Sequence, residues 1–96
     1  MPIFNFFRPI QPLNEADRRA LLLRTGRVAE GSIFDVATDE SGAESQIFYH
    51  YEANGVVYES SQTLDDEQSS RPDDYLPGAR IVVRYDPRQP GNSVVV

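Results

Sequence analysis

The sequence contains no cysteine, no lysine and no tryptophan, and it has a single histidine, His50. The absence of cysteine excludes disulfide bonds, thiolate nucleophiles and zinc–thiolate sites. Small secreted domains often depend on disulfide bonds, so their absence favours a reducing compartment. One histidine is too few for a metal site built from several imidazoles.

Long apolar runs are also missing. No stretch approaches the roughly 18 apolar residues that a membrane-spanning helix needs. Residues 1–9 are apolar but short, have no basic start and are interrupted by Pro2 and Pro9, which is not typical of a signal peptide. We therefore expect a cytoplasmic protein. We do not expect membrane contact, although the apolar N-terminus leaves such contact open.

Positive charge is scarce. The chain of 96 residues carries 15 acidic side chains against nine basic ones, all arginine, for a net charge of −6. Such a surface repels nucleic-acid phosphates and anionic lipids, so we expect no nucleic-acid partner. The 40% hydrophobic and 25% charged residues are ordinary for one globular domain with one modest core.

The first 13 residues combine apolar side chains with three prolines. Proline at this density opposes a helix and favours an extended path. One interpretation is an arm that lies across the domain and covers an edge of its core. The other is an arm that docks on a second subunit, a partner or a membrane interface. The apolar residues of this arm are Phe4, Phe6, Phe7, Ile10 and Leu13.

Residues 14–25 predict a short helix. Asn14 suits the N-cap, Asp17 the third helical position, and Gly26 the C-terminal stop. We expect its apolar stripe to pack against a sheet, because so short a helix is marginal alone. The stripe comprises Leu13, Ala16, Ala20 and Leu23, widened by Leu21 and Leu22, with Arg18 and Arg19 facing away.

Five later segments have the alternation and β-forming residues of strands. Gly31 interrupts the first of them and indicates a bulge or bend. Residues 63–78 form a long polar connection, and such loops are usually functional or mobile. The expected strands are residues 27–38, 45–53, 56–62, 80–85 and 93–96.

The clearest local signal is Asn54-Gly55, flanked on both sides by alternating apolar and polar residues. Asn-Gly suits a type I′ turn, in which both central residues need a positive φ. A two-residue turn fixes the register, so that Tyr51 faces Tyr58 and His50 faces Glu59.

One face of this hairpin is richer in apolar area, and we expect it to point into the core. The opposite face still holds Phe48 and Val57, which need a cover. We hypothesise that the N-terminal arm or the helix supplies it. The residues of the inward face are Ile47, Tyr49, Tyr51, Ala53, Val56 and Tyr58.

His50 and Glu59 are the candidates for acid–base chemistry, because a carboxylate beside an imidazole can build a general base. A surface charge pair is the simpler interpretation, since no nucleophile motif or glycine-rich phosphate loop accompanies them. We therefore predict no catalytic residue. The residues of a possible interaction surface are Phe4, Phe6, Phe7, Phe48, His50 and Glu59.

An acidic segment, residues 65–74, is the other candidate site. Carboxylate clusters bind Ca²⁺ or Mg²⁺. The spacing does not match a calcium-binding loop, so a solvated loop is the simpler interpretation, and we expect no metal and no cofactor. The acidic residues of the segment are Asp65, Asp66, Glu67, Asp73 and Asp74.

Two stretches form a composite pattern. They read Tyr49-x-Tyr51-x-x-Asn54-Gly55-x-x-Tyr58 and Pro77-Gly78-x-x-Ile81-x-Val83-x-Tyr85-Asp86-Pro87-x-x-Pro90, with Gly26-Arg27-Val28 as the start of the leading strand. The pattern resembles the bacterial DUF3592 family of domains of unknown function, over about residues 26–96. The resemblance implies a small β-domain, often attached to transmembrane helices, and it transfers no catalytic residue.

The chain is thus expected to form one domain over residues 1–96, with the arm at 1–13, the helix at 14–25 and the β-domain at 26–96. The predicted fold class is mainly β, a small antiparallel five-stranded and partly closed barrel with one short N-terminal helix. A β-sandwich is the alternative.

The predicted function is a non-catalytic binding or assembly module of unknown ligand, with a protein or a second copy as partner. The last strand ends in Val94-Val95-Val96 without a charged residue, which favours strand pairing between copies. The alternatives are a small acid/base enzyme using His50 and Glu59, and divalent-metal binding through residues 65–74.

Overall fold

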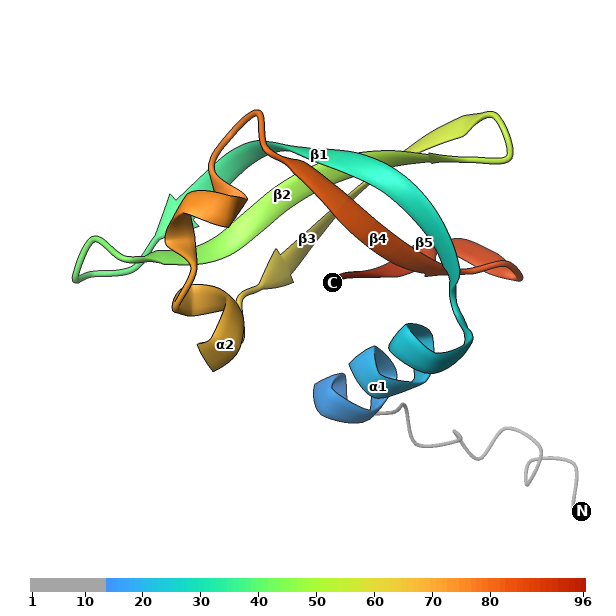
Figure 1. Cartoon of the computed structure of the whole chain (residues 1–96), viewed down its shortest axis with the longest axis horizontal. Coiled ribbons are helices and arrows are strands. Elements are labelled where there is room, and N and C mark those ends of the chain that lie inside the picture. The colour runs from blue at the N-terminus through green and yellow to red at the C-terminus, as the bar shows by residue number, and fades with distance from the viewer. Residues whose placement is uncertain (1–13) are drawn as a thin grey trace, which may run out of the picture.

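The computed structural model describes residues 14–96, which form an antiparallel sheet with one N-terminal helix and two short helical turns (Figure 1). The predicted mainly β fold is confirmed. The arm with Phe4, Phe6 and Phe7 lies outside the described residues. No helix within residues 14–96 is long and apolar enough to cross a membrane. The elements are α1 (Glu15–Thr25), β1 (Arg27–Thr38), β2 (Glu44–Ala53), β3 (Val56–Thr63), α2 (Asp66–Ser69), the 3₁₀-helix η2 (Pro72–Tyr75), β4 (Arg80–Asp86) and β5 (Gln89–Val95).

The five strands form one sheet in the order β3-β2-β1-β4-β5, with every neighbouring pair antiparallel. The sheet curves until its two edge strands, β3 and β5, contact each other, and Figure 1 shows the ends of these strands close together. The result is a nearly closed, barrel-like sheet, as predicted, rather than a sandwich of two sheets.

Side-chain amides join the two edges at this closure. The backbone N–H of Val95 donates to Gln62 Oε1 (2.8 Å), and its carbonyl oxygen accepts from Gln68 Nε2 (3.0 Å) and Gln62 Nε2 (3.4 Å). Two residues earlier, the carbonyl oxygen of Ser93 accepts from Arg18 Nη1 (2.8 Å). The edge of β5 that the sequence left open for pairing between copies is therefore already occupied at Ser93 and Val95.

The β2–β3 hairpin has the predicted turn and register. Asn54 and Gly55 have φ values of 53° and 81°, as a type I′ turn requires, and Tyr51 pairs with Tyr58. The predicted inward face is buried along most of its length. Val56, beside the turn, is the exception and is 51% exposed.

Tyrosines form the centre of the core. The rings of Tyr49 and Tyr51 lie 5.9 Å apart, and that of Tyr51 lies 6.2 Å from the ring of Tyr85. The hydroxyl of Tyr49 lies 2.7 Å from Ser93 Oγ, and that of Tyr51 donates to the carbonyl oxygen of Pro90 (2.5 Å). These partners satisfy hydroxyl groups whose burial would otherwise cost free energy.

Of the bulge or bend predicted at Gly31, the bulge is not found there. Gly31 pairs regularly with both neighbouring strands, whereas the register with β2 shifts between Ile33 and Asp35 and again between Ala37 and Thr38. A Cβ atom at Gly31 would lie 2.7 Å from the backbone oxygen of His50. Glycine at this position thus allows β1 and β2 to approach closely, and the predicted bulge lies further along the strand.

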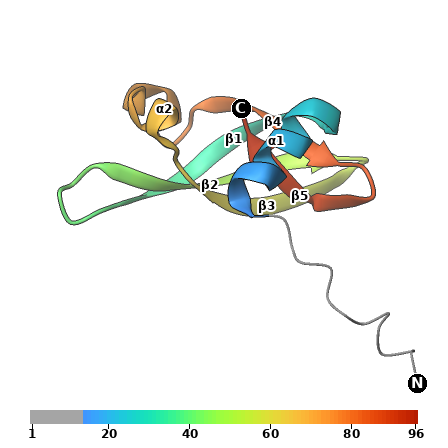
Figure 2. The same cartoon turned by 90° about the horizontal axis from the view of Figure 1, so that it is seen from below.

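Helix α1 has the predicted N-cap, since Asn14 Oδ1 accepts from the backbone N–H of Asp17 (2.8 Å). The expected packing of the helix against the sheet is confirmed, but of the predicted apolar stripe only Leu22 is buried among the described residues. The helix lies against β4 and β5, as Figure 2 shows, and it leaves Val57 64% exposed. The helix is therefore not the cover that we hypothesised. The exposed stripe residues are Ala16, Ala20, Leu21 and Leu23.

Two arginines explain this placement. Arg18 donates to Asn92 Oδ1 (2.9 Å) and to the carbonyl oxygen of Ser93 in β5 (2.8 Å). Arg19 donates to the carbonyl oxygen of Thr63 at the end of β3. The polar side of α1, expected to face away, thus satisfies backbone oxygens at both sheet edges, and charge-assisted hydrogen bonds of this kind are strong.

The long connection, predicted as a polar loop, contains two helical turns, α2 and η2. Asp65 accepts from the backbone N–H of Gln68 (2.7 Å), and Gln68 Oε1 accepts from the backbone N–H of Asp65 (3.2 Å), which is a capping box. Tyr75, at the end of η2, is 2% exposed and belongs to the core. The segment is therefore an ordered part of the fold.

Candidate interaction surface

Three aromatic side chains meet on the outer face of the sheet. Phe34 of β1 stacks on His50 of β2 with ring centroids 5.7 Å apart and an interplanar angle of 11°. The same phenylalanine lies 6.4 Å from the ring of Phe48. Phe34 is 46% exposed, and the other two residues are half-buried. We call Phe34, Phe48 and His50 the aromatic face.

A β-bulge creates this arrangement. Ile33 pairs with Tyr49 and Asp35 pairs with Phe48, so Phe34 has no partner residue on β2. A bulge reorients the side chains of its strand. Here Ile33 points into the core while both residues after it are exposed. The bulge therefore places the ring of Phe34 between those of two β2 residues.

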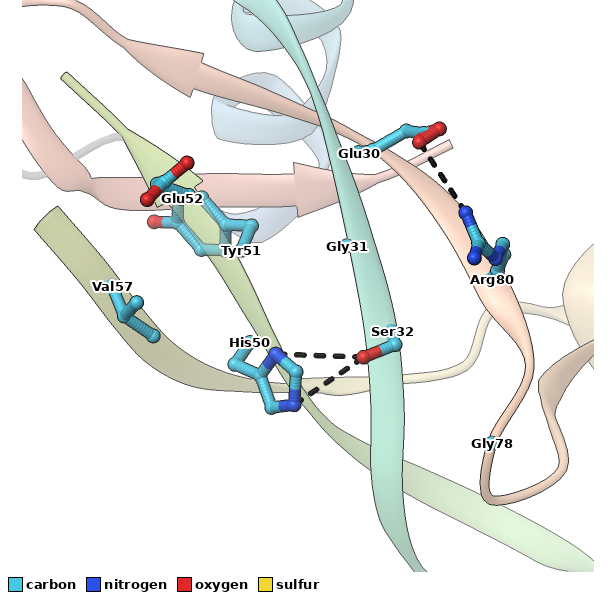
Figure 3. A pocket seen from close by; sticks show the side chains of 9 residues that line it. All are labelled: Glu30, Gly31, Ser32, His50, Tyr51, Glu52, Val57, Gly78 and Arg80. Atoms are coloured by element: carbon cyan, nitrogen blue, oxygen red, sulfur yellow. Dashed lines mark hydrogen bonds and ion pairs between the residues drawn. The ribbon is translucent and has the colours of Figure 1, made fainter. Parts of the chain in front are cut away.

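His50 contacts Ser32 and not the predicted partner. His50 and Glu59 are paired across β2 and β3, as expected, but within the described residues no hydrogen bond or ion pair joins their side chains. The imidazole nitrogens lie 3.3 and 3.4 Å from Ser32 Oγ, and Figure 3 shows these two side chains pointing toward one another. At this distance the contact is a weak hydrogen bond, and nothing holds Glu59 in the position of a partner for general base catalysis.

A shallow hollow of about 450 Å³ lies beside the aromatic face. Glu30 and Arg80 form an ion pair of 3.7 Å. Figure 3 shows this pair on one side of the hollow and Val57 on the other. Both members of the ion pair are largely exposed, so it contributes little stability. The hollow is lined by Glu30, Gly31, Ser32, His50, Tyr51, Glu52, Val57, Gly78 and Arg80.

The outer face around the aromatic rings is mainly acidic. Glu52 pairs with Val57, Glu59 with His50, and Asp35 with Phe48, so these three carboxylates point to the same side as the rings. All three acidic residues are exposed. The surface thus combines stacked apolar rings with negative charge at their margin.

The acidic segment does not gather its carboxylates around one point. Arg71 forms ion pairs with Glu67 (2.9 Å) and Asp74 (3.0 Å), and Asp65 caps α2. Within residues 14–96, no three histidine or acidic side chains are close enough to hold a metal ion. No observation in this segment favours metal binding.

The structure brings together part of the surface that the sequence indicated. Phe48 and His50 meet as neighbours on β2, and Glu59 lies at their margin. Phe4, Phe6 and Phe7 lie outside the described residues. Phe34 was missed, although a signal was present: Ile33 and Phe34 are consecutive apolar residues of one strand, and alternation directs one of them outward.

Comparison with known proteins supplies a family. The model of the family described as Domain of unknown function (DUF3592) matches residues 24–96, two residues before the start expected from the sequence. No curated protein and no solved structure matches the chain. The match covers most of the chain, including the hairpin, the aromatic face and the closing strands, and so this chain belongs to the DUF3592 family.

Proposed function

We propose that this domain is a non-catalytic module that binds a protein partner through the aromatic face. The observation that carries the proposal is the stacked arrangement of Phe34 and His50 on an exposed sheet face. Aromatic side chains are enriched at the centres of protein interfaces, where they contribute much of the binding free energy.

The charge of this surface favours one kind of partner. Glu52, Glu59 and Asp35 would attract a basic residue and repel nucleic-acid phosphates. The partner segment is therefore apolar, to cover Phe34 and Phe48, with an arginine or lysine at its margin. A second copy of the chain or another protein supplies this segment.

We also propose that the module acts in a reducing compartment such as the cytoplasm. The support is the absence of cysteine from the sequence, because small domains of oxidising compartments often depend on disulfide bonds.

Selection from a library of displayed random peptides tests the proposed function. The full chain is the bait, and bound peptides are counter-screened against the Phe34→Ser variant. We expect peptides that pair apolar with basic residues and that bind the variant at least tenfold more weakly.

The matched control is Val82→Ser, which changes an equally exposed residue, also 46%, on β4. Binding should be unchanged in this variant. Peptides that bind Phe34→Ser as well as the unmodified chain would contradict the proposal.

A further inference from the structure

A second apolar surface lies away from the aromatic face, between α1 and the segment that follows β3. It is a groove of about 500 Å³. Leu64, 8% exposed, is its most buried apolar residue, and Leu23 of α1 remains 44% exposed beside it. The groove is lined by Glu15, Ala16, Arg19, Ala20, Leu23, Thr63, Leu64 and Asp65.

Hydrogen bonds hold the two walls of this groove together. Arg19 donates to Glu15 Oε2 (2.7 Å) and to the carbonyl oxygen of Thr63, and its guanidinium lies 3.6 Å from Asp65. The cation is thus satisfied by partners on both walls. An apolar hollow between fixed walls is a ready binding surface for apolar side chains.

We propose that the N-terminal arm of the same chain, residues 1–13, docks in this groove. The arm ends at Leu13, next to the first turn of α1, and that turn supplies Glu15 and Ala16 to the groove. The occupant is therefore tethered at the mouth of its own site, which raises its effective concentration far above that of a separate chain.

The length of the arm fits the groove. Ala16 and Leu23 are seven residues apart, which is about 10 Å along a helix axis. An extended chain covers that distance in three to four residues, at about 3.3 Å each. The segment 6–10 is long enough to lie along the groove, with residues 11–13 left to reverse the direction of the chain.

The chemistry of the arm also fits. Arg8 is its only charged residue, and at the groove margin the carboxylate of Asp65 is 51% exposed and lies 3.6 Å from its cationic neighbour Arg19, which leaves room for a second cation. The three prolines remove backbone N–H groups, which favours side-chain packing in a groove over pairing with a strand edge. The apolar residues available for the groove are Phe4, Phe6, Phe7, Ile10 and Leu13.

A tryptophan placed in the arm tests this proposal, because the chain has none of its own. In the full chain carrying Phe7→Trp, the emission maximum should lie to the blue of the same protein in denaturant. Quenching by acrylamide should be several-fold weaker than in denaturant. Adding Ala20→Lys, which fills the groove with a cation, should restore red emission and strong quenching.

The control adds Val57→Lys to Phe7→Trp, which makes the same charge change on the outer face and should leave the emission blue. Circular dichroism checks that all variants are folded. An exposed tryptophan in the single variant, or burial that persists with Ala20→Lys, overturns the proposal. Sedimentation of the same samples shows whether the chain is a monomer or a dimer. A dimer whose tryptophan becomes exposed on dilution would place the arm in the groove of a second copy, and this result too overturns the proposal.

Discussion

The side-chain amide of Gln62 forms hydrogen bonds with both backbone groups of Val95, at 2.8 and 3.4 Å. It therefore acts as the neighbouring strand would in a continuous ladder. Gln62 and Gln68 are each 4% exposed, so this polar contact between β3 and β5 is inside the protein. Buried backbone groups are nearly always paired, and here two glutamines provide the pairing.

Replacing Gln62 by leucine should lower the free energy of unfolding by about 1–3 kcal/mol, because the backbone N–H of Val95 is then buried without a partner. Urea denaturation measures the change. Gln46→Leu is the control, since Gln46 of β2 makes one long hydrogen bond of 3.4 Å to Ser61 in an exposed setting. It should change stability by less than about 0.5 kcal/mol. Equal effects of the two substitutions would show that the closure is not held by Gln62.

Gly31→Ala should destabilise the domain by about 1–3 kcal/mol, a range typical of overpacking. The added methyl group would lie 2.7 Å from the backbone oxygen of His50 and 3.1 Å from Val83 Cγ2. Thermal unfolding measures the loss. Gly91→Ala is the matched control, because no heavy atom lies within 4 Å of a Cβ at that position. A stable Gly31→Ala variant would mean that β1 and β2 can separate at this point without cost.

The stability of the domain should depend on Glu15 at acidic pH. Hydrogen bonds from Arg18 lower the pKa of this carboxyl; burial opposes them, and the hydrogen bond from Arg19 adds to the lowering, so that the pKa falls from 4.5 to about 2. Its contribution is therefore complete above pH 4.5 and is lost as the pH falls towards about 2. The exposure of the carboxylate limits this contribution to less than about 1 kcal/mol.

Denaturation at several pH values compares the unmodified chain with Glu15→Gln. The variant should be less stable at pH 7, and the difference should disappear near pH 2. Glu40→Gln, which changes an exposed carboxylate without an ion pair among residues 14–96, should show no such pH dependence. A constant difference between the Glu15 variant and the unmodified chain at all pH values would contradict the role of the ion pairs.

Much of the sheet could be predicted because its signals are local. Asn54-Gly55 permits the positive φ values of a type I′ turn, and a two-residue turn then fixes every pair of the hairpin. The order of the strands and the contact between Gln62 and Val95 were not predictable in this way. The hairpin register places Gln62 opposite Ile47 on the inward face, but polar side chains usually face water, so its burial against Val95 did not follow from the sequence.

The orientation of α1 was mispredicted for a related reason. Its apolar stripe predicted one buried side of the helix. Arg18 and Arg19 instead donate hydrogen bonds to backbone oxygens of the two sheet edges, and one helix can reach both edges only when β3 and β5 have come together. The turn of α2, by contrast, had a local signal: Asp65 followed three residues later by Gln68 is the pattern of a capping box.

The candidate surface was predicted in part. Phe48 and His50 followed from the hairpin register, but their contact with Phe34 depends on a bulge in the neighbouring strand. Such a bulge changes which residues share a face, and no glycine marks it at Phe34. The prediction placed the irregularity at Gly31, where the sequence pattern was most visibly interrupted.

The central claim, that the aromatic face binds a protein partner, is tested most directly by mapping a selected peptide on the full chain. Amide chemical shifts are recorded while an apolar and basic peptide from the display selection is added. We expect the largest shifts around Phe34, Phe48 and His50, and a loss of these shifts in the Phe34→Ser variant. Shifts confined to other parts of the sheet or to α1, unchanged by Phe34→Ser, would contradict the claim.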